Sequence, residues 1–124
     1  MSYNENDVLF TAIDPFGYPI VLTSSRYYGH ILSSDNNHQA HPEFTPEEVK
    51  KTIEHPAYIF ESNRPNADVY FAKNCSQHPD LFLKVAVEKY DKYGFVSTVF
   101  PVPKVKGGIK EEGLKYANYK SELR

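Results

Sequence analysis

The sequence predicts an α+β domain in which a β-hairpin and two helices are followed by an antiparallel meander. Three observations lead to this prediction: an N-terminal turn rich in proline and glycine, a helix-capping signature at Thr45, and strand-like alternation between residues 57 and 101. The chain has 124 residues, 40% of them hydrophobic and 15% aromatic, which is enough for a domain with a core of its own. We expect a single domain over 1–124, with its core in residues 7–110 and flexible ends at 1–6 and 118–124.

The N-terminal third predicts a hairpin and a first helix. Apolar segments on either side of the Pro- and Gly-containing turn indicate a strand, a turn and a returning strand at 7–14, 14–19 and 20–23. Thr23 or Ser24 can then cap a helix over 25–33, which ends where the chain becomes strongly polar.

The second helix is predicted from its capping residues. Thr45 is a good N-cap, Pro46 suits the first helical position, and Glu48 completes a capping box. We expect the helix to span 45–55 and to end at Pro56.

Four strands are then expected, at 57–62, 68–73, 81–89 and 94–101. Apolar residues occur on both faces of 81–89, which indicates a central strand paired on both sides. A short helix is expected around 111–120, near the C-terminus.

Charge is distributed unevenly. Residues 1–62 contain three basic and nine acidic residues, whereas residues 63–124 contain eleven basic and seven acidic residues. A polyanion would therefore meet the C-terminal half first, where Lys104, Lys106 and Lys110 cluster. The alternative is an ordinary solvated lysine surface.

Composition indicates a cytoplasmic protein. No apolar run approaches the roughly 18 residues of a membrane helix, and the polar, acidic N-terminus does not resemble a signal peptide. Cys75 is the only cysteine, so the chain cannot form an internal disulfide. His38 and His41 have no third ligand nearby and make a poor zinc site, so no metal or cofactor is expected.

Two histidines are candidates for acid–base catalysis. His30 lies on the predicted first helix and His41 follows in a polar loop, and imidazoles titrating near neutrality are what a metal-free phosphodiesterase needs. The alternative for each is a solvated surface histidine. His55 and His78 precede prolines at element ends and are not candidates.

Other polar residues could contact a phosphate. Thr98 lies on the strand 94–101, where strict alternation puts it on the same face as Val96 and Phe100. Arg64, close after Ser62, could clamp a phosphate with two hydrogen bonds, although a polar turn explains it equally well.

Short motifs follow one another along the chain in a recognisable order. The N-terminal ones are Asp14-Pro-Phe-Gly, Val21-Leu-Thr, Tyr28-Gly-His-Ile and His41-Pro-Glu-Phe. The later ones are Val49-Lys-Lys-Thr-Ile-Glu-His-Pro, Ile59-Phe-Glu-Ser, Val69-Tyr-Phe, Leu83-Lys-Val-Ala-Val, Val96-Ser-Thr-Val-Phe and Lys104-Val-Lys-Gly-Gly-Ile. Over residues 7 to about 110 this order resembles the PBECR family, phage-encoded domains akin to barnase, EndoU, the tRNA-cutting colicins and RelE.

The resemblance implies a fold of two helices packed on a four-stranded antiparallel sheet, and a metal-independent ribonuclease of toxin or phage type. It implies RNA, including tRNA, as the substrate, and a protein inhibitor or immunity partner. The polar positions of the family match His30, His41 and Thr98, and also Ser62 and Lys106.

We therefore expect an RNA endonuclease that works by transesterification and leaves 2′,3′-cyclic phosphate ends, with His30, His41 and Thr98 as catalytic residues. The expected substrate-binding residues are Arg64, Lys104, Lys106 and Ser62, with Tyr70, Tyr90 or Tyr93 as platforms on which bases stack. The alternative is a nuclease-fold interaction module without activity, whose acidic N-terminal half binds a protein. The sequence leaves the oligomeric state open.

Overall fold

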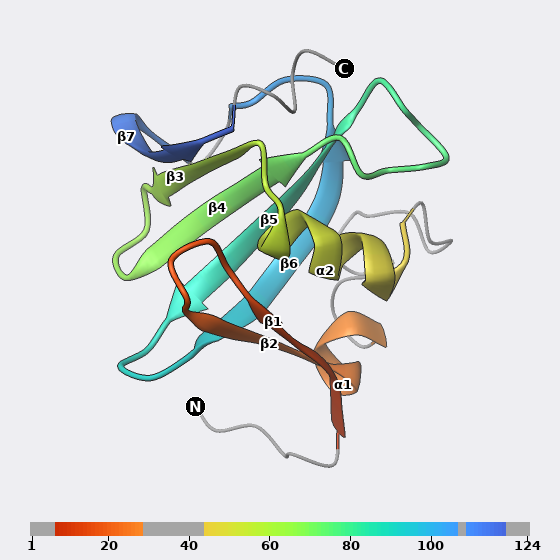
Figure 1. The fold of residues 1–124 in the computed structure, drawn as a ribbon, viewed down its shortest axis with the longest axis vertical. Coiled ribbons are helices and arrows are strands. Elements are labelled where there is room, and N and C mark those ends of the chain that lie inside the picture. The colour runs from red at the N-terminus through yellow and green to blue at the C-terminus, as the bar shows by residue number, and fades with distance from the viewer. Residues whose placement is uncertain (1–6, 29–43, 107–108, 119–124) are drawn as a thin grey trace.

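The computed structural model describes residues 7–28, 44–106 and 109–118, which form one seven-stranded mixed sheet and two helices (Figure 1). The strands are β1 (Val8–Ile13), β2 (Pro19–Thr23), β3 (Tyr58–Ser62), β4 (Ala67–Ala72), β5 (Phe82–Lys89), β6 (Gly94–Val102) and β7 (Ile109–Ala117). The helices are α1 (Ser24–Arg26) and α2 (Pro46–Glu54). The strand order is β1-β2-β6-β5-β4-β3-β7, and β2 and β6 are the parallel pair among antiparallel neighbours.

The expected four-stranded sheet with two helices is wrong, because both ends of the chain add strands to it. Ile20 and Val21 of β2 pair with Gly94 and Phe95, so the N-terminal hairpin extends the sheet beyond β6. At the other edge β7 pairs with β3, where a helix was expected at 111–120. The open edge of β3 offers backbone groups that need hydrogen-bond partners, and a strand satisfies them where an isolated helix would not.

The central meander is confirmed. β3, β4, β5 and β6 follow one another as antiparallel neighbours, and β5 is paired on both sides. Leu83, Val85 and Val87 of β5 are fully buried, as expected for the middle of the sheet.

The second helix is also confirmed in its position and its cap. The Thr45 side chain accepts from the Glu48 backbone at 3.2 Å, and a Glu48 carboxylate oxygen accepts from the Thr45 backbone at 2.9 Å. The second carboxylate oxygen of Glu48 accepts from the Ser76 backbone at 2.8 Å, which ties α2 to the loop after β4.

The first helix begins as expected, since the Thr23 side chain accepts from the Arg26 backbone at 3.2 Å. Most of the predicted helix 25–33 lies outside the described residues, as do the predicted flexible ends except Asn118. Within the described ranges, neither helix is long and apolar enough to cross a membrane.

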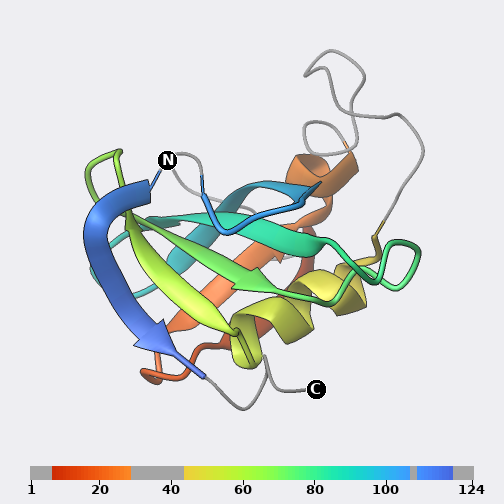
Figure 2. The same ribbon diagram turned by 90° about the horizontal axis from the view of Figure 1, so that it is seen from above.

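The core lies between α2 and one face of the sheet (Figures 1 and 2). Val49 and Ile53 of α2 join the buried side chains of β2, β3, β4, β5 and β6 in a single cluster. The sheet also curls, because Phe16 in the turn after β1 packs edge-on against Tyr116 of β7, with ring centroids 6.1 Å apart. The hairpin at one edge of the sheet and β7 at the other edge therefore contact each other.

Candidate functional site

The face of the sheet opposite α2, which we call the outer face, carries four cross-strand pairs. Along β5, the buried core residues alternate with half-buried Phe82, Lys84, Ala86 and Glu88. Their partners on β6 are, in the same order, Val102, Phe100, Thr98 and Phe95. Directly opposed residues have Cβ atoms about 4.5–5.5 Å apart, so these eight side chains share one surface.

Three basic side chains lie over aromatic rings of the outer face. The Lys84 Nζ atom is 5.0 Å from the centroid of Phe100, and the Lys73 Nζ atom is 5.3 Å from that of Phe82. The guanidinium carbon of Arg26 is 5.4 Å from the centroid of Phe95. All three lie within the range of a cation–π interaction. We call this set the cation–aromatic stripe: Arg26, Lys73, Phe82, Lys84, Phe95 and Phe100.

A β-bulge sets the direction of Thr98. Ala86 pairs with Thr98 whereas Val87 pairs with Val96, so Ser97 is an extra residue in β6, and its hydroxyl donates to the Ala86 carbonyl at 3.1 Å. Strict alternation would put Thr98 on the same face as Val96. Val96 is fully buried in the core, so that face is the one that packs against α2. The extra residue instead turns Thr98 to the outer face, within the stripe.

Lys84 is the basic residue of the stripe nearest to Thr98 by strand register. The two are diagonal neighbours across β5 and β6, a relation in which residues lie about 7–8 Å apart. Lys84 is half-buried, and this burial lowers the pKa of its ammonium group. Its charge is therefore costly in the folded protein, and an anion bound beside it would offset that cost.

Aromatic rings continue from the stripe toward the β3 edge. Lys84 pairs with Phe71 of β4, and Phe71 pairs with Tyr58 of β3. The Phe60 ring lies 6.1 Å from that of Phe71 and 6.2 Å from that of Tyr58. Phe71 is fully buried beneath these neighbours, whereas Tyr58 and Phe60 are half-buried.

The predicted catalytic histidines, His30 and His41, lie outside the described residues. Both ends of the segment that contains them are described. The Tyr27 hydroxyl donates to the Phe44 carbonyl at 3.1 Å, which joins the two ends, and Arg26 lies over Phe95 on the outer face. Arg26 therefore lies at the stripe, whereas Tyr27 and Phe44 belong to the buried core cluster.

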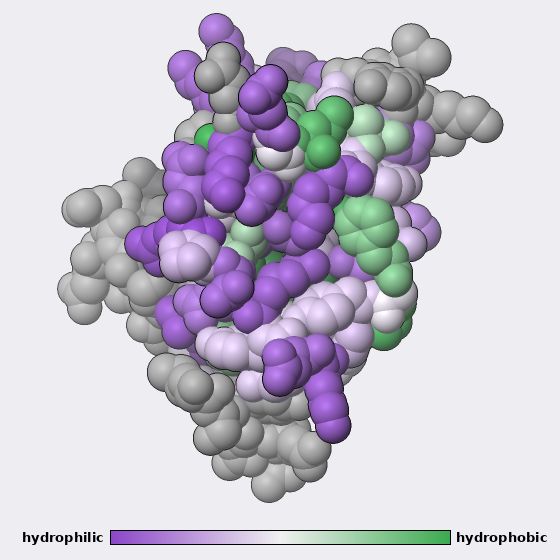
Figure 3. All heavy atoms as spheres, turned by 90° about the vertical axis from the view of Figure 1, so that its left-hand side faces the viewer, coloured by the Kyte–Doolittle hydropathy of each residue, from purple (hydrophilic) through white to green (hydrophobic). Residues whose placement is uncertain are grey.

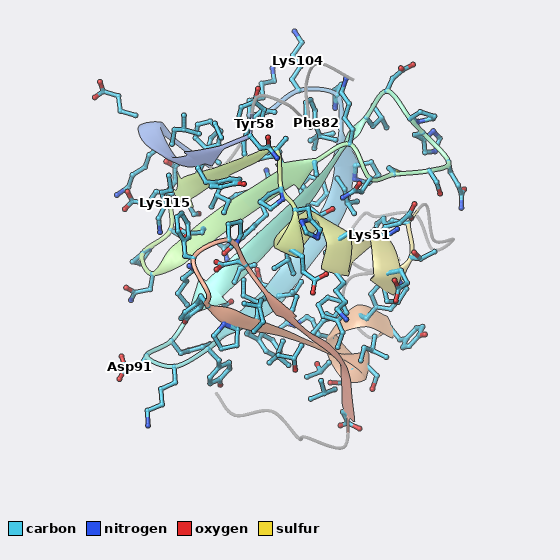
Figure 4. The ribbon with its side chains drawn as sticks, in the orientation of Figure 1. Lys51, Tyr58, Phe82, Asp91, Lys104 and Lys115 are labelled. Atoms are coloured by element: carbon cyan, nitrogen blue, oxygen red, sulfur yellow. The ribbon has the colours of Figure 1, made fainter. Side chains whose placement is uncertain are left out.

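The four predicted substrate-binding residues lie around the end of β3 and just after β6. Lys104 and Lys106 are exposed just after β6, and Lys104 lies at the same end of the molecule as Tyr58 and Phe82 (Figure 4). Arg64 is exposed in the turn between β3 and β4, where its backbone N–H donates to the buried Ser62 hydroxyl at 3.1 Å. Ser62 pairs with Ile109 of β7, which follows Lys106 by three residues, so strand pairing does not separate Ser62 from Lys106.

Of the three tyrosines expected to stack on bases, Tyr70 cannot do so. It is fully buried, and its hydroxyl donates to the Asp14 carboxylate. Burial and the Asp14 carboxylate raise its pKa. Tyr90 and Tyr93 lie in the turn between β5 and β6, with ring centroids 5.2 Å apart.

None of the six residues of the cation–aromatic stripe was among the site residues predicted from the sequence. The alternation in 81–89 indicates a central strand but does not show which face remains open, so Phe82 and Lys84 look like core residues in the sequence. One signal in the sequence could have indicated the stripe: Lys84 is a charged residue between aromatic and apolar residues on a strand predicted to be central. Arg26 and Lys73 reach the stripe through tertiary packing, which no local pattern reveals.

The part of the chain that the structure describes contains no group of three or more His, Cys, Asp or Glu side chains placed to hold a metal ion. No protein-family model matches this sequence, and no curated protein or solved structure matches it. The resemblance to the PBECR family therefore rests on the short motifs themselves.

Proposed function

We propose that this chain is an RNA endonuclease that binds single-stranded RNA across the outer face and cleaves it by transesterification. The observation that supports this most is the cation–aromatic stripe with Thr98 within it. Proteins that bind single strands combine cations for the phosphates with aromatic rings for unpaired bases, and the outer face carries cations beside the half-buried rings of Phe82 and Phe100.

The proposed reaction needs an acid, a base and groups that stabilise negative charge. One of His30 and His41 removes the ribose 2′-hydroxyl proton, and the 2′-oxygen forms a bond to the adjacent phosphorus. The bond from phosphorus to the 5′-oxygen breaks as the other histidine donates a proton to that oxygen. The products are a 2′,3′-cyclic phosphate and a 5′-hydroxyl, and DNA is resistant because it lacks the nucleophile.

Thr98 and Lys84 are assigned to the charge that develops on phosphorus. The Thr98 hydroxyl donates to a non-bridging phosphate oxygen, and the Lys84 ammonium lies beside it. The lowered pKa of Lys84 is consistent with this role, because a cation held in a poorly solvated position interacts more strongly with a bound anion.

The histidines are assigned to the acid and base roles by their residue type, because imidazoles exchange protons near neutral pH. The described residue that relates their segment to the stripe is Arg26, which lies over Phe95, three residues before Thr98 on β6.

The test is cleavage of a labelled single-stranded RNA in the presence of EDTA, with analysis of the product ends. We expect 2′,3′-cyclic phosphate ends, and a loss of about 10²–10⁴ in rate for His30→Ala and for His41→Ala. His55→Ala is the matched control, since His55 is an exposed histidine at the C-terminal end of α2. RNA binding without cleavage in the wild-type protein would instead support the inactive interaction module.

A further inference from the structure

The turn between β5 and β6 forms a depression that the proposed reaction does not use. Its volume is about 770 Å³, and it is lined by Asn66, Lys89, Tyr90, Asp91, Lys92 and Tyr93. Asp91 marks its place at the end of the sheet opposite Lys104 (Figure 4).

The lining of the depression suits a nucleobase better than a bare phosphate. Tyr90 and Tyr93 present ring surface, and Tyr90 is 36% exposed. Asn66 and Asp91 bring an amide oxygen and a carboxylate to the lining, and both groups can accept from the amino groups of bases. The Lys89 ammonium forms an ion pair with the Asp68 carboxylate at 2.9 Å, so we assign Lys89 to the structure of the depression rather than to ligand binding.

The surroundings also favour a polar ligand. Figure 3 views the molecule from the side of β7 and these turns, and its surface there is mainly hydrophilic, with apolar side chains in separate spots. A large apolar partner surface would find little to contact there.

The turn is held in shape by Tyr18 of the N-terminal hairpin. The Tyr18 hydroxyl hydrogen-bonds to the carbonyls of Tyr90 and Tyr93 and accepts from the Tyr90 backbone at 3.1 Å. The Tyr90 backbone also donates to the Tyr93 carbonyl at 2.9 Å. These bonds fix the backbone that carries both rings, so Tyr18 is a positioning residue for the depression.

A hydrogen bond and a strand pair link the wall of the depression to the cation–aromatic stripe. The Tyr90 hydroxyl donates to Glu88 at 2.9 Å, and Glu88 pairs with Phe95, over which Arg26 lies. Tyr93 precedes Thr98 by five residues, which corresponds to about 16 Å along the strand. This separation exceeds the length of one nucleotide.

We infer that the Tyr90–Tyr93 depression is a base-binding subsite for a nucleotide beyond the one cleaved at Thr98. The inference rests on the proposed RNA endonuclease function and adds a length requirement to it. A dinucleotide spans the cleavage site but cannot reach the subsite, whereas an oligonucleotide extended on the correct side occupies both.

The test compares kcat/KM for an RNA dinucleotide and for hexanucleotides extended on its 5′ or its 3′ side. We expect one extension to raise kcat/KM by roughly 5- to 140-fold, the worth of one base stacked on an aromatic ring. Tyr90→Leu with Tyr93→Leu should remove that gain and leave dinucleotide cleavage unchanged, and an abasic nucleotide at the subsite position should do the same. Tyr18→Phe should reduce the gain in part.

Tyr116→Leu on β7 is the matched control and should keep the full gain. Equal cleavage of all lengths, with no effect of the tyrosine substitutions, would overturn the subsite and leave the nuclease assignment intact. An equal loss on the dinucleotide and the hexanucleotides would also overturn it, because it would show that the turn only supports the fold. Absence of both RNA cleavage and RNA binding would overturn the proposed function itself.

Discussion

The hydroxyl of Tyr70 in β4 donates a hydrogen bond to the carboxylate of Asp14 at the end of β1, across 56 positions of sequence. Both residues are buried, and Asp14 is only 3% exposed. The other carboxylate oxygen of Asp14 accepts the backbone N–H groups of Phe16 and Tyr18, each at 2.9 Å. Asp14 therefore fixes the turn after β1 and joins it to the middle of the sheet.

A second buried carboxylate extends this connection to β7. Asp68 of β4 accepts from Lys89 at 2.9 Å and from Lys115 at 2.7 Å. The two aspartates and their partners therefore link the first hairpin, β4, β5 and β7. Because partly satisfied buried charges are costly, this arrangement favours one curled form of the sheet over an open one.

Tyr70→Phe should lower the free energy of unfolding by about 1–3 kcal/mol, because it leaves a buried carboxylate oxygen without its hydroxyl donor. Urea unfolding followed by far-UV circular dichroism measures this change. Tyr116→Phe, at a half-buried tyrosine of β7, is the control and should change stability by less. An unchanged midpoint for Tyr70→Phe would show that water or Lys89 replaces the donor.

Alkaline pH should destabilise the fold through two buried tyrosines. Burial raises the pKa of Tyr27 to about 12, and burial and the hydrogen bond to Asp14 raise that of Tyr70. Their contribution to stability is fully present below the unfolded pKa of about 10 and is lost as pH rises above it. Phenolate absorbance should show these two tyrosines ionising only as the protein unfolds, and ionisation of every tyrosine near pH 10 in the folded state would contradict this.

Glu48 should make the fold sensitive to acid. Burial tends to raise its pKa, but hydrogen bonds from Ser76 and Thr45 outweigh burial and lower it. A lowered carboxyl pKa gives stability that is present above the unfolded value, near 4.3, and is lost as pH falls through the folded value. Glu48→Gln should therefore flatten the dependence of unfolding free energy on pH below about 5, and Glu47→Gln, at an exposed neighbour, should not.

The parts of the fold that local patterns control are the ones that the sequence predicts. The capping box at Thr45 and the alternation of β5 depend on neighbouring residues, and both are present as expected. β7 is held chiefly by backbone pairing with β3 across two register shifts, and its sequence lacks the alternation that would have indicated a strand.

Close approach between distant segments explains the other differences. A Cβ atom at Gly94 would lie 2.8 Å from Val87 and 3.0 Å from Tyr18, so a glycine permits β2 to pair alongside β6. Sequence patterns do not show that requirement. The direction of Thr98 likewise depends on one extra residue, Ser97, which strict alternation cannot anticipate.

Lys84→Met on the outer face should stabilise the fold and weaken RNA binding. Burial lowers the pKa of Lys84, so its charged form disfavours folding, and an apolar side chain of similar length should shift the urea midpoint upward. The same change removes a cation from the proposed RNA path. It should weaken binding of an uncleavable 2′-deoxy oligonucleotide and reduce the slope of log K against log salt by about 0.7, the value for one phosphate contact on a single strand.

Lys51→Met is the matched control, because Lys51 is exposed on α2, on the other side of the sheet (Figure 4). Higher stability with unchanged binding and salt dependence would show that Lys84 lies off the RNA path, whereas loss of both properties would show that Lys84 supports the sheet itself.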